Sequence, residues 1–193
     1  KSIENIKVSK LDKVKLKSKI LFIEAKIARS ENDIDKSNSL FNEALQNQIS
    51  TGKYNNPFTC LILRNIATKY RENSEFEKAI EIYKREREIW DYYKDYFYYQ
   101  KGINYYNVGT FYYELTEIDA AIDNYNKAKI NWGKEQPTKN YQRYLHEALG
   151  DLYFEKGDKK SASYYWIEAN RILPPKNKDI TDDILVLEQK TND

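Results

Sequence analysis

The stretch ALGDLYFEKGDKKSASYYWIEANRILP, residues 148–174, decides the fold of this chain. Gly150 leaves a gap on a first predicted helix, and large side chains such as Trp166 on a second helix fill the space around it. Gly157-Asp158 separates the two helices, because glycine accepts the left-handed conformation at a helix end and aspartate accepts hydrogen bonds from the free amides of the next helix. The stretch therefore predicts two antiparallel helices joined by a tight turn.

The same pattern recurs along the chain at a fixed period. A small residue on the first helix, here called helix A, is separated from its counterparts by 42, 42 and 41 residues, and an aromatic residue on the second helix, helix B, by the same intervals. The small residues are Ala25, Ala67, Gly109 and Gly150, and the aromatic residues are Phe41, Tyr83, Tyr125 and Trp166. Two independent positions that keep one register indicate four copies of a single structural unit.

Seven residues of the quoted stretch carry a resemblance to a known family; they are Gly150, Tyr153, Gly157, Ala162, Trp166, Ala169 and Pro174. The chain resembles the tetratricopeptide repeat family, whose basic unit has about 34 residues. Its period of 42 is similar to that of the family's long-repeat branch. The resemblance implies an all-α solenoid of helix-turn-helix repeats, a right-handed superhelix with the A helices on its concave surface. Glu86 departs from the pattern, which expects a small residue there.

The resemblance covers about residues 18–174 and leaves a short segment at each end. We expect residues 1–17 to be a leading helix or the remnant of an earlier repeat. Residues 175–193 are expected to hold a linker, a capping helix near 179–189 and a tail, because a solenoid needs a terminal element over its last apolar face. The four repeats are expected at about residues 18–51, 60–93, 102–135 and 143–174.

Composition narrows the classes of function. The net charge of +2 lacks the electrostatic field of a nucleic-acid-binding protein, and no apolar run approaches the ~20 residues of a membrane span. Residues 1–29 are locally basic, with nine Lys or Arg against three Asp or Glu, which suits a solvated helix face or a docking patch for an acidic partner. A protein or peptide is therefore the expected partner.

The cellular compartment stays open. A single cysteine, Cys60, excludes an internal disulfide and a zinc cluster of cysteines; a cytoplasmic protein is slightly favoured, with an exported one as the alternative. Because the chain contains no methionine, we expect a processed or excised piece of a longer product. A composition rich in Lys, Asn, Ile and Tyr is typical of an AT-rich genome and favours a bacterial source.

The resemblance implies a binding groove lined by the A helices. Carried over position by position, its residues run from basic, through aromatic and neutral, to acidic. We expect this order to orient a partner segment with one acidic and one basic end and an apolar or aromatic anchor near Tyr106 and Tyr113. The alternative is that the order reflects chance, since exposed helix faces are commonly charged. The groove positions are Lys19, Phe22, Lys26 and Arg29, then Arg64, Thr68 and Arg71, then Tyr106, Thr110 and Tyr113, and last Glu147, Asp151 and Glu155.

The sequence contains no HExxH motif, P-loop or dinucleotide fingerprint. His146 and Cys60 are expected to be packing residues, and the aromatic run Trp90–Tyr106 is expected to pack between repeats, with Trp90, Tyr93, Phe97 and Tyr98 at the junction. We therefore expect a non-catalytic scaffold that needs no cofactor or metal and does not bind nucleic acid. The alternative is a sensor module that controls a signalling, protease or DNA-binding domain outside this chain.

Overall fold

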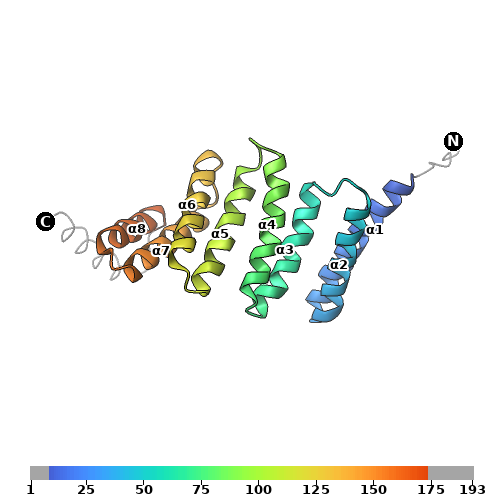
Figure 1. The fold of residues 1–193 in the computed structure, drawn as a ribbon, viewed down its shortest axis with the longest axis horizontal. Coiled ribbons are helices and arrows are strands. Elements are labelled where there is room, and N and C mark those ends of the chain that lie inside the picture. The colour runs from blue at the N-terminus through green and yellow to red at the C-terminus, as the bar shows by residue number, and fades with distance from the viewer. Residues whose placement is uncertain (1–8, 174–193) are drawn as a thin grey trace. The chain divides into compact units, whose positions relative to one another are not determined.

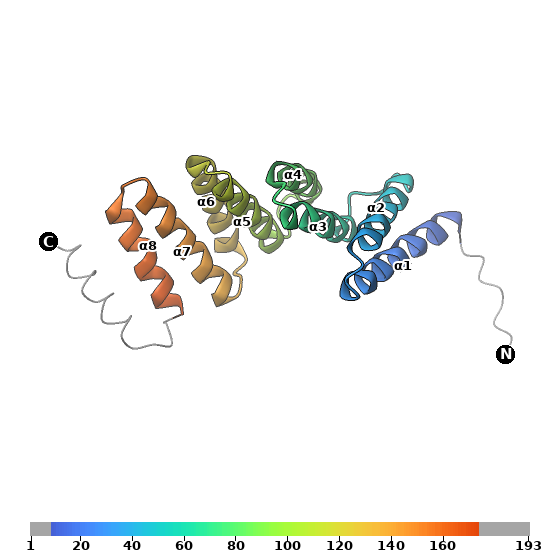
Figure 2. The same cartoon turned by 90° about the horizontal axis from the view of Figure 1, so that it is seen from below.

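The computed structural model of this protein describes residues 9–173. Within this range all regular secondary structure is α-helical, and eight helices follow one another as antiparallel pairs (Figures 1 and 2). The all-α prediction is confirmed, and the expected capping helix at 179–189 lies outside the described residues. The helices are α1 (Lys10–Ser30), α2 (Ile34–Ser50), α3 (Pro57–Glu72), α4 (Phe76–Tyr92), α5 (Tyr98–Glu114), α6 (Ile118–Lys134), α7 (Lys139–Glu155) and α8 (Lys159–Ile172).

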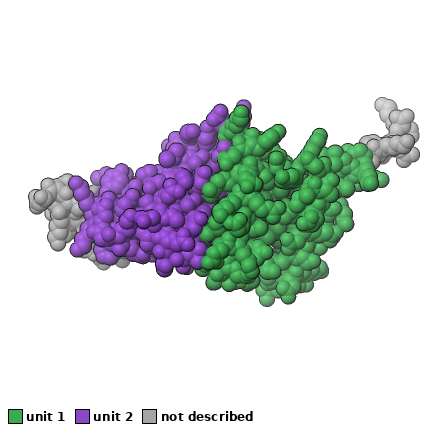
Figure 3. Space-filling view, viewed as in Figure 1, with its two compact units in different colours: residues 1–94 green, residues 95–193 purple. Residues whose placement is uncertain are grey.

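The chain divides into two compact units, residues 1–94 and 95–193, which Figure 3 distinguishes by colour. Helices α1 to α4 belong to the first unit and α5 to α8 to the second. Within the first unit α3 packs against α2, and within the second unit α7 packs against α6. Each unit is therefore built from two hairpins, with the A helix of the later hairpin against the B helix of the earlier one.

Helix α1 is longer than the sequence pattern predicts. The expected start of the first repeat at residue 18 falls inside α1, because no helix-breaking residue interrupts it after Lys10. Ser9 begins the helix, since its side chain accepts a hydrogen bond from the Asp12 amide at 3.1 Å. Residues 10–17 therefore extend the first A helix and do not form a separate leading helix.

All four turns between helices A and B use the same backbone conformation. One residue in each turn has a positive φ, and the amide of the residue after it donates to a carbonyl five residues earlier, as from Asp158 to Tyr153 at 2.9 Å. The Asp158 side chain accepts from the Ser161 amide at 3.1 Å, which confirms its predicted capping role. The positive-φ residues are Asn32 (63°), Ser74 (56°), Thr116 (59°) and Gly157 (80°). Glycine therefore occupies only the last of these four left-handed positions.

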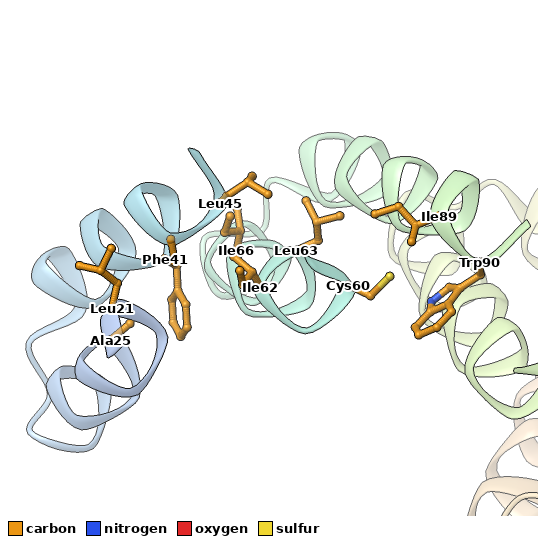
Figure 4. Packing of buried hydrophobic residues seen from close by; sticks show 11 residues of the cluster. Leu21, Ala25, Phe41, Leu45, Cys60, Ile62, Leu63, Ile66, Ile89 and Trp90 are labelled. Atoms are coloured by element: carbon orange, nitrogen blue, oxygen red, sulfur yellow. The ribbon is translucent and has the colours of Figure 1, made fainter. Parts of the chain in front are cut away.

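The small and aromatic residues of the repeat meet as predicted. A Cβ atom built on Gly109 would lie 2.8 Å from Cδ1 of Tyr125, and one built on Gly150 would overlap the indole of Trp166. Ala25 and Phe41 are both buried in the core cluster of the first unit, which Figure 4 shows. The pairing of a small residue with a ring therefore determines how closely the helices of a hairpin approach.

The left-handed turn positions make a reciprocal prediction about stability. Thr116→Gly should raise the free energy of unfolding by about 0.5–1 kcal/mol, because a β-branched residue is strained at positive φ. Gly157→Thr should lower it by about 1–2 kcal/mol for the same reason, since no atom outside the turn lies within 4 Å of a Cβ at that position. Urea unfolding followed by circular dichroism measures both changes. Opposite signs would contradict the backbone explanation.

Close helix approach makes a second prediction. Gly150→Ala should destabilise the protein by about 1–3 kcal/mol through overlap with Trp166, and adding Trp166→Phe should restore part of this loss, because the pair then copies Ala25 and Phe41. Gly133→Ala in α6 is the matched control, since a Cβ there meets no atom within 4 Å. The control should be neutral or stabilising by up to about 1 kcal/mol. Equal losses in both alanine variants would rule out the steric account.

Candidate functional site

The A helices of the first unit meet through two of the predicted groove residues. Arg29 in α1 places Nη2 3.3 Å from Oε2 of Glu72 at the end of α3. The ring of Phe22 lies 5.5 Å from that of Phe41 and 5.3 Å from that of Phe58, in edge-to-face contacts. These two groove residues therefore join the hairpins of the unit.

Arg64 is held by a buried carboxylate. Glu86 in α4 is fully buried, and its Oε1 atom accepts from Nε of Arg64 at 2.6 Å and from Nε1 of Trp90 at 2.7 Å. The other repeats have Ala44, Ala128 and Ala169 at the position of Glu86, all buried. Glutamate is tolerated here because an opposite charge and a second donor compensate for its desolvation. The guanidinium of Arg64 therefore neutralises a buried charge in the core of the second repeat.

Three other basic groove residues take no such part in the core. Lys19 and Lys26 in α1 and Arg71 in α3 are exposed, and the described part of the chain contains no ion-pair partner for any of them. Thr68 in the same row donates its hydroxyl hydrogen to the Arg64 carbonyl at 2.9 Å, within its own helix. The face of α1 and α3 therefore presents basic side chains that are available to a ligand.

The A helices of the second unit meet at the equivalent position. The hydroxyl of Tyr113 in α5 donates to Oε1 of Glu155 in α7 at 2.9 Å, and this hydrogen bond is the main cause of the raised pKa of Tyr113. Tyr106 packs its ring 5.4 Å from that of Tyr125, and burial raises the pKa of its phenol. Both groove tyrosines are thus neutral groups anchored by neighbours.

The remaining groove residues of the second unit are also tied to the fold. The hydroxyl groups of Thr110 and Tyr125 lie 3.1 Å apart, and burial raises the pKa of Tyr125 to about 12. Oδ1 of Asp151 accepts from Nε1 of Trp166 at 3.0 Å. Glu147 pairs with Arg143 one turn earlier, at 2.6 Å. Asp151 and Glu155 are nonetheless exposed, so this face presents carboxylates beside tyrosine.

Comparisons with known proteins identify the fold of this chain. No protein-family model and no curated protein matches the chain. The TPR-like repeats of a putative kinesin light chain from Podosopora anserina superpose with a TM-score of 0.60 at 10% identity, over 90% of this chain and 95% of that one. The fold is that of the tetratricopeptide repeat.

Two further structures share the tetratricopeptide fold with this chain. BtubC from P. vanneervenii superposes with a TM-score of 0.71 at 20% identity, over 80% of this chain and 62% of that one. The chain thus spans less than two thirds of BtubC. The MamA protein superposes with a TM-score of 0.59 at 18% identity, over 91% of this chain and 90% of that one. Sequence identities this low establish a shared fold alone. The partners of this chain must therefore be inferred from its own surface residues.

Two potential reactive side chains lie in different tetratricopeptide units and have structural contacts. Burial, followed by the charge of Glu86, raises the pKa of the Cys60 thiol, and its Sγ lies 4.0 Å from the Glu86 carbonyl. Nδ1 of His146 lies 2.7 Å from the Gln142 carbonyl, which can only accept a hydrogen bond, and its ring is 5.9 Å from that of Tyr165. Both residues pack as expected, with the thiol neutral at physiological pH.

Two of the cavities among the described residues lie where the two hairpins of a unit meet. One of about 300 Å³ lies between α2, α3 and α4, with Leu45 and Leu63 in its wall and Arg85 at its edge. Another of about 180 Å³ lies beside His146 and Trp132 in the second unit. From residue 9 to residue 173 there is no cluster of metal-ligating side chains, and none of the helices in this range is long and apolar enough to cross a membrane.

The aromatic run Trp90–Tyr106 starts in α4 and continues into α5. Trp90 is buried in the first core cluster, Tyr93 packs against that cluster, and the Tyr93 hydroxyl donates to the Asn55 carbonyl at 3.0 Å. Phe97 has a left-handed backbone at the start of α5 and is 37% exposed. Tyr98 lies under the Nζ atom of Lys134, 4.4 Å from the ring centre. The packing interpretation therefore holds for Trp90 and Tyr93 in the first unit, and for Tyr99, Tyr105 and Tyr106, which pack against the core cluster of the second unit.

Sequence reasoning missed Glu72 and Glu86 as partners of groove residues. Glu72 lies 43 residues after Arg29, about one repeat period. An opposite charge at that spacing could have predicted the ion pair between them. Glu86 had a stronger signal, because a charged residue at a small-residue position needs a partner on the facing helix.

The buried ion pair predicts the effect of removing its cation. Arg64→Met should destabilise the first unit by about 3 kcal/mol, because the carboxylate of Glu86 stays buried without its charge partner. Arg64→Met combined with Glu86→Ala should be less destabilised than the single variant, since the second change removes the buried charge and restores the residue of the other repeats. Urea unfolding of the three proteins tests this coupling. Additive losses would show that the two side chains act independently.

Proposed function

We propose that the chain is a non-catalytic scaffold that binds protein or peptide segments on the A-helix faces of its tetratricopeptide units. The observation that carries this proposal is the set of exposed basic residues on α1 and α3, namely Lys19, Lys26 and Arg71. They lie in a row whose other basic members, Arg29 and Arg64, are engaged in ion pairs within the fold. Unengaged charge on helices that are already packed suits ligand binding, because no internal ion pair has to be broken and the helical backbone is already ordered.

The two units are expected to prefer ligands of opposite charge. The face of the first unit is basic, whereas that of the second unit combines Tyr113 with the carboxylates of Asp151 and Glu155. Complementary charges set the orientation and association rate of a partner more than its affinity. We therefore infer a partner with an acidic segment for the first unit and a basic segment, with an apolar or aromatic anchor, for the second.

Selection from a random-peptide phage library tests the proposal on the whole chain. Peptides that depend on the first unit should be acidic, and Lys26→Glu with Arg71→Glu should weaken their binding more than tenfold. Arg64 is left intact in this variant, because its reversal would place two carboxylates in the core. Fluorescence anisotropy gives the dissociation constants.

The matched control for this test is Lys36→Glu with Arg85→Glu, which makes the same change in net charge on the B helices α2 and α4. It should leave the dissociation constant within about twofold, since rim charges distant from a contact contribute little. If the control weakens binding as much as the A-helix variant, long-range charge explains the effect and the A-helix site is wrong.

A further inference from the structure

Helix α1 carries an exposed apolar row that its hairpin does not cover. Leu16, Ile20, Ile23 and Ile27, here called the α1 stripe, are between 46% and 58% exposed. Their spacing of four, three and four residues places them on one face of the helix. Four branched apolar side chains in one row exceed the isolated surface residues that are ordinary in a soluble protein.

The period of the chain shows what this face does in other repeats. Ile62 in α3 and Leu145 in α7 occupy the position of Ile20 and are 0% and 1% exposed. Ile62 belongs to the cluster that includes Phe41 and Leu45 of α2, toward which it points in Figure 4. Leu145 belongs to the corresponding cluster with residues of α6. This face of an A helix therefore normally packs against the B helix of the preceding repeat.

The first unit offers no described helix to fill that role for α1. Among residues 9–173, α1 packs extensively only against α2, which is its own B helix and lies on another side. The α1 stripe is thus a stacking face without a described occupant. It spans about 17 Å along the helix, so it matches about three turns of a partner helix.

Charge indicates the chemistry of the occupant. Helix α1 contains seven Lys or Arg and two acidic residues, Asp12 and Glu24. Lys13, Lys19 and Lys26 are exposed beside the stripe, and Lys17 pairs with Glu43 at 2.8 Å. A second copy of α1 would bring the same excess of positive charge to this face. A helix with acidic residues on its flanks would be attracted to it.

We infer that the α1 stripe docks an amphipathic helix of a partner protein, with an apolar row against Ile20 and Ile23 and acidic residues facing the flanking lysines. The docked helix takes the place that α2 takes against α3. This site adjoins the proposed A-helix groove and shares Lys19 and Lys26 with it, but it differs from the groove in burying the apolar side chains of the α1 stripe.

Two designed helical peptides of 21 residues test the inference with the whole chain. Both carry the same leucine row, and their flanks are glutamate in one and lysine in the other. The glutamate peptide should bind, and the lysine peptide should bind at least tenfold more weakly in fluorescence anisotropy. Failure of the glutamate peptide to bind, or equal binding of both, overturns the proposal.

Paired variants locate the binding site. Ile20→Gln with Ile27→Gln should weaken the glutamate peptide at least tenfold, while the affinity of phage-selected groove peptides should be unchanged. Leu61→Gln with Ile130→Gln removes two apolar residues elsewhere that are at least as exposed as Ile20 and should have no effect. Circular dichroism verifies that all variants remain helical. An equal loss in the control pair places the peptide elsewhere and contradicts the inference.

Other occupants give distinct results. Analytical ultracentrifugation of the whole chain should show no self-association that depends on Ile20 and Ile27; a dimer lost in that variant would mean that a second copy covers the stripe. Sedimentation with phosphatidylcholine vesicles containing phosphatidylserine should show no binding that the variant removes. Either positive result would overturn the partner-helix proposal.

Discussion

Each hairpin depends on the contact between a small residue on helix A and an aromatic ring on helix B. The ring fills the space that the small residue leaves, so the two backbones can approach closely. In the third and fourth repeats the polar atom of this ring also contacts a residue of the candidate binding face. Tyr125 bonds the hydroxyl of Thr110, and Trp166 donates to Asp151, each of which directly follows the small residue. The core contact thereby positions a side chain of the candidate binding face.

This coupling explains why the candidate face differs between the units. In the first repeat the ring is Phe41, which has no polar atom, and Lys26 at the neighbouring position is left for solvent or a ligand. In the fourth repeat the indole of Trp166 holds Asp151 in place. The same packing arrangement therefore places Lys26 beside Phe41 in the first repeat and Asp151 beside Trp166 in the fourth.

The sequence allowed the hairpins and their period to be predicted because packing repeats with the chain, as in Gly109 with Tyr125. It did not reveal the left-handed turns at Ser74 and Thr116, because the surrounding hydrogen bonds impose a conformation that these residues do not favour. The partner of Arg64 was missed for another reason. A period shows which positions are equivalent, whereas an ion pair depends on which side chains face each other across two helices.

The buried Glu86 has a consequence for how such a chain assembles. Near-identical hairpins can exchange partners during folding, since any A helix presents a small residue to any B helix of the same period. Helix α4 is an exception, because only α3 supplies an arginine at the place where the carboxylate is buried. Any swapped pairing would strand that charge in an apolar interface at a cost of several kcal/mol. Glu86 therefore disfavours hairpins in which α4 pairs with an A helix other than α3.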